Sequence, residues 1–149
     1  MTLENLLRIG QLKEHPPDAG EIQRLLAAAR RNLSDAGVTA ISPETRFDAA
    51  YKAIMQASLA VMIAHGFRPD TSRPGQHQTL LQALTLTIGL AAPRVTVLDT
   101  LRRKRNLSDY TGEEIDESTA SACAMEAHRL LNDVTAWLKA NRPGLSDSP

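Results

Sequence analysis

The sequence of 149 residues predicts an all-α protein, an antiparallel bundle of five to six helices. Apolar residues recur at spacings of three and four along most of the chain, which places them on one face of successive helices. Capping residues, proline and glycine separate these periodic segments. No alternating run is long enough for a convincing strand, and helices joined by short loops pack as antiparallel neighbours. We expect one domain over residues 1–142 and a disordered tail over residues 143–149.

Start and stop signals set the order of the expected helices. Asp18, with Glu21 three residues later, has the form of a capping box. Ser42 before Pro43 is typical of a helix start. The segment 67–76 is rich in Arg, Pro, Ser and Gly, and we expect it to be a loop. The expected helices lie near residues 2–12, 18–37, 42–66, 77–92, 93–112 and 113–141.

The apolar faces of these helices also predict the core. A helix that packs on one side repeats its apolar residues every three or four positions, and those residues face the interior. We expect the core to contain eight large residues in particular: Phe47, Tyr51, Ile54, Leu84, Leu98, Leu101, Leu131 and Leu138.

Composition narrows the classes of function. Basic and acidic residues both number 17, so the formal net charge is zero and any site for a polyanion must be local. Cys123 is the single cysteine, which excludes an intrachain disulfide and fits a cytoplasmic protein. No apolar stretch is long enough to span a bilayer. The sequence also lacks a glycine-rich phosphate loop and a zinc motif, so we expect no membrane segment, metal or cofactor.

A cationic cluster, Leu-Arg-Arg-Lys-Arg, occupies residues 101–105. The apolar stripe that enters it contains Leu98 and Leu101, and the next position on that face is Arg105. A buried guanidinium needs a partner, and Asp109, four residues further on, is the obvious one. The alternative is a helix that ends in solvated charge, with an Arg–Asp pair of little energetic weight.

The residues around this cluster suggest a site for phosphate or ribose. Arg102, Asn106 and Tyr110 recur every four positions, so we expect them to line one groove, with Arg105 entering from the neighbouring face. Arginine forks bind phosphate, and such a set can also orient a ribose 2′-hydroxyl for attack on its own phosphate without a metal. We expect His77, at the start of a helix, to assist; the alternative is a half-buried capping histidine.

Three segments, taken in order, resemble the HEPN family (higher eukaryotes and prokaryotes nucleotide-binding domains). Residues 46–54, Arg-Phe-Asp-Ala-Ala-Tyr-Lys-Ala-Ile, resemble the family's central helix. Residues 66–69, Gly-Phe-Arg-Pro, with residues 75–77, Gly-Gln-His, resemble the loop and the start of the next helix. Residues 105–110, Arg-Asn-Leu-Ser-Asp-Tyr, resemble the hallmark motif. The likeness extends roughly from residue 22 to residue 138 and implies a HEPN-like fold.

The resemblance also implies a set of site residues. Active HEPN proteins are metal-independent ribonucleases whose motif is an Arg, an adjacent polar residue and a His four to six residues after the Arg. Arg105 and Asn106 match the first two positions, but Tyr110 stands where the His would be. Tyrosine is a poor general base at neutral pH because its pKa is near 10, so this departure leaves ribonuclease activity open. The catalytic set is then Arg105, Asn106 and Tyr110, and the ligand-binding set is Arg102, Arg103, His77 and Asp109, with Asp109 holding Arg105 in place.

Two functions follow from the resemblance. The first is a HEPN-like protein of a toxin–antitoxin or defence system that binds RNA or nucleotide, with metal-independent ribonuclease activity left open by the degenerate motif. The second is a catalytically inactive subunit that docks a nucleotidyltransferase-type antitoxin or a DNA-binding protein. A helical bundle without a ligand is a third reading. Because family members commonly dimerise with their motif helices facing each other, we expect a homodimer with Arg102, Arg105, Asn106 and Tyr110 at or beside the interface.

Overall fold

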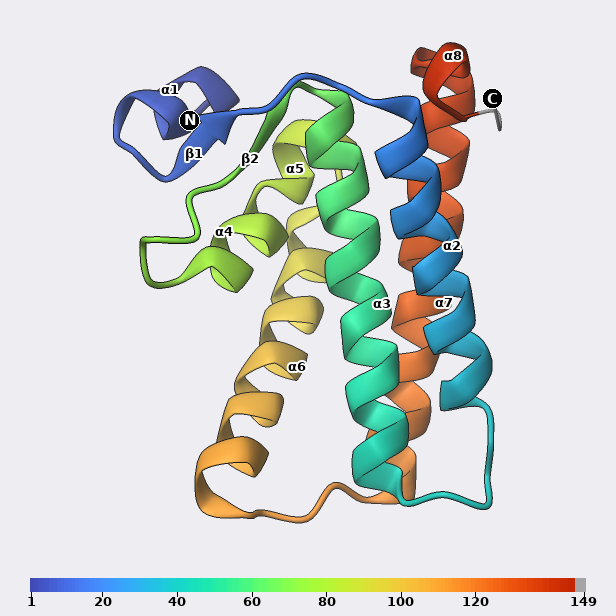
Figure 1. Cartoon of the computed structure of the whole chain (residues 1–149). Coiled ribbons are helices and arrows are strands. Elements are labelled where there is room, and N and C mark those ends of the chain that lie inside the picture. The colour runs from blue at the N-terminus through green and yellow to red at the C-terminus, as the bar shows by residue number, and fades with distance from the viewer. Residues whose placement is uncertain (147–149) are drawn as a thin grey trace.

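The computed structural model describes residues 1–146, and its fold is all-α apart from one small two-stranded sheet (Figure 1). The predicted all-α class is therefore confirmed. Within residues 1–146, no helix is both long enough and apolar enough to cross a membrane. In chain order the elements are α1 (Leu3–Arg8), β1 (Leu12–Glu14), α2 (Ala19–Ala36), α3 (Pro43–Ala64), β2 (Phe67–Pro69), α4 (Gln76–Gln82), α5 (Leu84–Thr87), α6 (Ala92–Thr111), α7 (Glu117–Asn141) and α8 (Pro143–Ser146).

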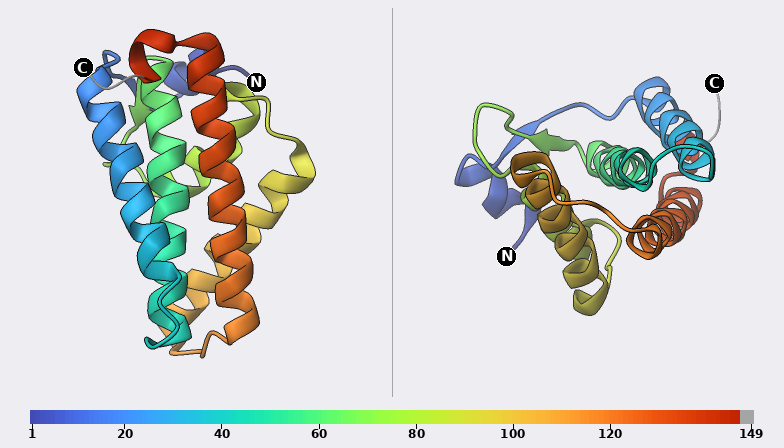
Figure 2. Two further views of the ribbon diagram at one scale, coloured as in Figure 1. Left: turned by 90° about the vertical axis from the view of Figure 1, so that its right-hand side faces the viewer. Right: turned by 90° about the horizontal axis from the view of Figure 1, so that it is seen from below.

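Three long helices, α2, α3 and α7, lie side by side along the length of the molecule (Figures 1 and 2). Helix α3 packs against both of the others and is buried over most of its length. Small side chains allow this close packing, because each turn of α3 after the first contributes a buried alanine, at positions 50, 53, 57, 60 and 64. The remaining side of α3 faces α4 and α6, and this side forms part of the candidate site.

The helix-start signals in the sequence act as caps. The hydroxyl of Ser42 accepts a hydrogen bond from the backbone N–H of Thr45, at 3.2 Å. The carboxylate of Asp18 accepts from the backbone N–H of Gly20, at 2.9 Å, so Asp18 caps α2 through its second residue rather than through Glu21. These caps fix where α2 and α3 begin and therefore which of their faces meet.

The predicted core is confirmed. Every one of the eight large residues expected in the interior is at most 7% exposed. The periodic spacing of apolar residues therefore predicted burial correctly, including the side of α6 that contains Leu98 and Leu101. Those two are the buried residues of α6, so the cationic half of this helix, beyond Leu101, lies at the surface of the described structure.

Two predictions hold only in part: a helix over residues 2–12, of which residues 3–8 are helical, and a loop over residues 67–76, which holds for residues 70–75. Helix α1 is short, and β1 pairs antiparallel with β2. Gly10 and Gly66 adopt positive φ angles of 80° and 91°, which turn the chain out of α1 and out of α3. The paired strands satisfy each other's backbone groups while Leu12 is buried, and this gain outweighs continuation of a short helix.

The helix count also exceeds the expected five to six, because eight helices lie within residues 1–146. Ala83 separates α4 from α5, so the single helix expected over residues 77–92 is broken there. At the other end, residues 143–146 form α8 instead of the start of a disordered tail. Leu145 packs against the core, and its carbonyl accepts a hydrogen bond from Nε2 of Gln23, at 2.7 Å. The rest of the expected tail, residues 147–149, lies outside the described residues.

Candidate functional site

A cleft of about 370 Å³ lies between α3, α4 and α6. Helix α3 forms one wall, through four residues on one of its faces. Helix α4 contributes His77, and α6 contributes Arg105, the last cation of the cluster. The six lining residues are Asp48, Tyr51, Lys52, Met55, His77 and Arg105. The cleft thus joins parts of the sequence that the HEPN resemblance identified separately.

Tyr51 is the centre of this cleft. Its side chain is only 2% exposed, and its hydroxyl lies 3.2 Å from Nδ1 of His77. The guanidinium carbon of Arg105 lies over the tyrosine ring, 5.0 Å from its centroid, which is a cation–π distance. One buried ring therefore positions both a cation from α6 and an imidazole from α4.

Burial decides the protonation of the two rings. Burial raises the pKa of Tyr51 to about 12, although Arg105 and Arg102 oppose the rise, so its hydroxyl keeps its proton at neutral pH. Burial lowers the pKa of His77, and the positive charges of Arg105 and Arg102 lower it further. The imidazole is therefore neutral near pH 7. We assign the Tyr51 hydroxyl as donor to Nδ1 of His77, which leaves the imidazole proton on Nε2.

Carboxylates balance the cations of the cleft. Oδ2 of Asp109 lies 3.7 Å from Nε of Arg105, so the expected Arg105–Asp109 pair is present, at the outer limit of an ion pair. Burial raises the pKa of Asp48, and the charge of Asp109 raises it further, while Arg105 and Lys52 act in the opposite direction. Because the Arg105–Asp109 contact is long and partly exposed, an anionic ligand can displace Asp109 at little energetic cost.

The other predicted cations are engaged elsewhere. Nε of Arg102 lies 2.7 Å from Oδ1 of Asp99, and Nε of Arg103 lies 3.1 Å from Oδ2 of the same carboxylate. Asp99 is only 13% exposed, so it is held between the two guanidinium groups. Neither Arg102 nor Arg103 lines the cleft, and Arg102 influences it through charge rather than contact.

The structure does not bring Asn106 and Tyr110 into the cleft. Asn106 is partly buried but is not among the lining residues, and Tyr110 is 87% exposed. The reason is helical geometry: with 3.6 residues per turn, a residue five positions after Arg105 points about 140° away from it. Of the predicted site residues, Arg105 and His77 therefore meet in the cleft, and Asp109 contacts it through Arg105.

Sequence reasoning missed four residues of the cleft: Asp48, Tyr51, Lys52 and Met55. Tyr51 was expected in the core, and it is buried, but a buried tyrosine hydroxyl also needs a hydrogen-bond partner. That requirement was the available signal, because it implied a polar group close to the buried ring. Asp48 and Lys52 lie close to Tyr51 in the sequence but belong to no motif that would have marked them as site residues.

The cleft combines a cation held over an aromatic ring, a neutral imidazole, a lysine and the carboxyl group of Asp48. The two cations and the imidazole N–H together can hold an anion. Within residues 1–146, no cluster of three or more potential metal-ligating side chains is found. Comparison with known proteins adds no assignment, since no protein-family model and no curated protein matches the chain.

Proposed function

We propose that the cleft between α3, α4 and α6 binds the phosphate of an RNA strand or a nucleotide, in a HEPN-like protein of a toxin–antitoxin or defence system. The observation that carries the proposal is the convergence of Arg105 and His77, from two different helices, on the buried ring of Tyr51. Arg105 supplies a permanently charged fork for phosphate, and Lys52 adds a second cation at the same cleft. The family assignment itself rests on the resemblance of the sequence motifs.

The protonation of His77 favours binding over cleavage. With Tyr51 donating to Nδ1, the imidazole presents an N–H at Nε2, which is a donor for an anionic ligand oxygen. A general base for attack by a ribose 2′-hydroxyl needs the opposite tautomer, with Nε2 unprotonated. For His77 to serve as that general base, the Tyr51–His77 hydrogen bond must reverse its direction.

Fluorescence anisotropy with a labelled single-stranded RNA tests binding. We expect Arg105→Ala to weaken binding by about tenfold or more at low salt, because it removes the charged fork. Arg103→Ala is the matched control, since it removes the same charge from an exposed position on the same helix. Equal losses in the two variants would mean that RNA senses only the general charge of α6, and the cleft would not be its site.

Cleavage is tested separately with the same RNA in the presence of a metal chelator. The proposal expects binding to persist under these conditions, because the cleft residues hold phosphate through their own charges and hydrogen bonds. Cleavage that survives the chelator and is lost in His77→Ala would identify the cleft as a ribonuclease site. Cleavage that survives in both His77→Ala and Arg105→Ala would place the activity elsewhere.

A second candidate function is the docking of a protein partner, and the exposed surface of α6 favours it. Val97, Leu107 and Tyr110 are exposed large side chains on this helix. We propose that this face contacts a second copy of the chain or, in the docking reading, a nucleotidyltransferase-type antitoxin. Exposed apolar and aromatic groups are typical of interfaces.

Light scattering tests the homodimer. We expect a dimer mass at micromolar concentration that is lost in Leu107→Glu, because a buried unpaired charge opposes association. Met125→Glu is the control, since Met125 is a comparably exposed apolar residue on α7. A monomer mass for the wild-type protein would contradict the homodimer, and binding of a candidate antitoxin would then have to be measured directly.

A further inference from the structure

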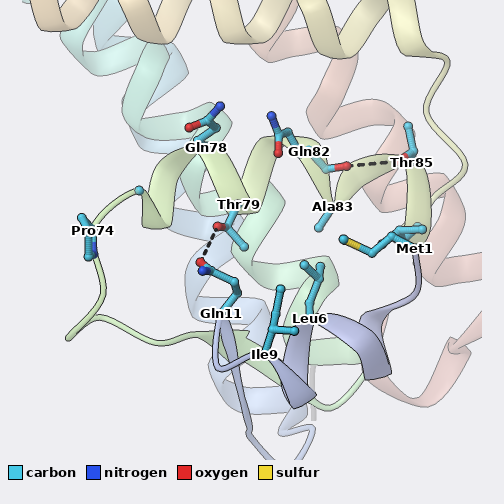
Figure 3. Close-up of a pocket in the computed structure, with 12 residues that line it drawn as sticks. Met1, Leu6, Ile9, Gln11, Pro74, Gln78, Thr79, Gln82, Ala83 and Thr85 are labelled. Atoms are coloured by element: carbon cyan, nitrogen blue, oxygen red, sulfur yellow. Dashed lines mark hydrogen bonds between the residues drawn. The ribbon is translucent and has the colours of Figure 1, made fainter.

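A second cavity, of about 590 Å³, lies between α1 and the α4–α5 segment (Figure 3). It shares no lining residue with the Arg105 cleft. One wall consists of residues on α4, at the break and on α5: Gln78, Thr79, Gln82, Ala83 and Leu86. Helix α4 therefore presents His77 to one site and a different face to the other.

The lining of this cavity is apolar and polar but carries no charged side chain. Leu6 and Ile9 of the α1 segment lie on one side in Figure 3, and Gln78 and Gln82 lie along the opposite edge. Ile9 is an exposed large apolar residue, so the apolar side is accessible. Apart from Met1, which carries the α-amino group of the chain, the lining offers no charged group, so it suits a neutral ligand with an apolar face.

Three primary amides at this cavity have hydrogen-bonding capacity to spare. Within residues 1–146, the side chains of Gln78 and Gln82 have no protein hydrogen-bond partner, and Gln82 is exposed, so a ligand would replace solvent at these amides. The third amide, that of Gln11, has one weak contact, 3.5 Å from its Oε1 to Oγ1 of Thr79 (Figure 3). Each amide offers both a donor and an acceptor, so it can form a paired contact with another amide group. The glutamines therefore match a ligand that presents a carbonyl and an N–H side by side.

The geometry points to a binding site for a small, uncharged, planar ligand with an amide edge. The apolar residues of α1 cover a face of the ring, and the glutamines of α4 pair with its edge. Two sources supply this chemistry: a ring lactam, as in the base of uridine, and an exocyclic carboxamide, as in nicotinamide. The inference rests on this cavity alone and does not depend on the proposed function of the Arg105 cleft.

Nuclear magnetic resonance titration of the full chain tests the site, with the glutamine side-chain N–H₂ signals as the readout. We expect uridine or nicotinamide to shift the signals of Gln78 and Gln82 saturably. A shift with uridine alone assigns the ring lactam, and a shift with nicotinamide alone assigns the carboxamide. If neither compound shifts these signals at millimolar concentration, the proposal is overturned.

Matched ligands and variants test the amide pairing. If uridine binds, N3-methyluridine, which lacks the lactam N–H, should bind about tenfold more weakly. Gln82→Leu should weaken either ligand by a similar factor, and Gln76→Leu, on the same helix but outside the lining, should not. Equal binding of wild type and Gln82→Leu, or of the two uridines, would contradict amide recognition. The ligand comparison uses the wild-type chain, so it holds even if a variant fails to fold.

Discussion

The hydroxyl of Tyr51 lies 3.2 Å from Nδ1 of His77, and this contact joins α3 to α4 at the candidate site. Burial raises the pKa of the tyrosine to about 12 and lowers that of the histidine, so a neutral hydroxyl meets a neutral imidazole at pH 7. The Arg105 guanidinium lies over the same tyrosine ring. The state of this one hydrogen bond therefore determines what His77 presents to a ligand.

Removal of the hydroxyl tests that contact. Tyr51→Phe should lower the free energy of unfolding by about 1 kcal/mol, because it deletes one part-buried hydrogen bond and keeps the ring. Nitrogen chemical shifts of wild-type His77 at pH 7 should show Nδ1 without a proton and Nε2 with one. The exposed Tyr110 supplies the control, since Tyr110→Phe should leave stability unchanged. A protonated Nδ1 would reverse the assigned direction of the bond.

The half-buried histidines His65 and His77 predict a pH dependence of stability. The pKa values of His65 and His77 are lowered from 6.5 in the folded chain, chiefly by burial. Below pH 6.5 the unfolded chain therefore binds more protons than the folded chain. Each histidine should then reduce the free energy of unfolding by up to about 1 kcal/mol for each pH unit below 6.5. The measurement is urea unfolding at a series of pH values between neutral and mildly acidic. The double variant His65→Gln, His77→Gln should show a weaker dependence of the free energy of unfolding on pH. An unchanged dependence would mean that these two histidines are not its cause.

Arg46 should be far more important for stability than Glu117, with which it forms an ion pair. Its buried guanidinium donates to the carbonyl of Ala36, at 2.9 Å, and to Oε2 of Glu117, at 2.7 Å, which ties α2, α3 and α7 together. Arg46→Ala should cost about 2–3 kcal/mol, because it removes packing and leaves a buried carbonyl without its partner. Glu117→Gln should cost less than about 1 kcal/mol, since Glu117 is 67% exposed. Similar losses in denaturant unfolding would contradict this ranking.

The Arg105–Asp109 pair should restrain anion binding. Asp109 competes with a phosphate for Arg105 across the 3.7 Å contact, so Asp109→Asn should strengthen RNA binding by about two- to fivefold at low salt. Anisotropy titrations measure the change. Asp35→Asn alters the net charge equally from an exposed position on α2, and it should have a smaller effect. If both variants strengthen binding to the same extent, Asp109 acts only through net charge.

The fold class and the core followed from the sequence because both depend on helical periodicity, which is local. Leu98 and Leu101 were expected in the interior on spacing alone, and both are buried. The strands β1 and β2 did not follow, because they depend on pairing between segments more than fifty positions apart and on two glycine turns. Three-residue strands carry too few side chains for an alternating pattern.

The candidate site was predictable only in part. Arg105 and His77 were identified from charge and from the family resemblance, and they share the cleft. Tyr51 was expected only as a core residue, because an apolar stripe does not reveal that a buried ring supports two polar neighbours. Tyr110 was expected in the site on motif spacing, but the pitch of α6 directs it outward, and its 87% exposure follows. Motif spacing along a chain therefore does not determine which side chains meet.

The most direct test of the central claim is nuclear magnetic resonance titration of the wild-type protein with a short single-stranded RNA. We expect the Nε signal of Arg105 and the ring signals of His77 to shift together and to saturate with one dissociation constant that rises steeply with salt. The Nε signal of Arg103, which pairs with Asp99 outside the cleft, should change far less. Saturable shifts of Arg103 with no change at Arg105 and His77, or no shifts at low salt, would contradict phosphate binding in this cleft.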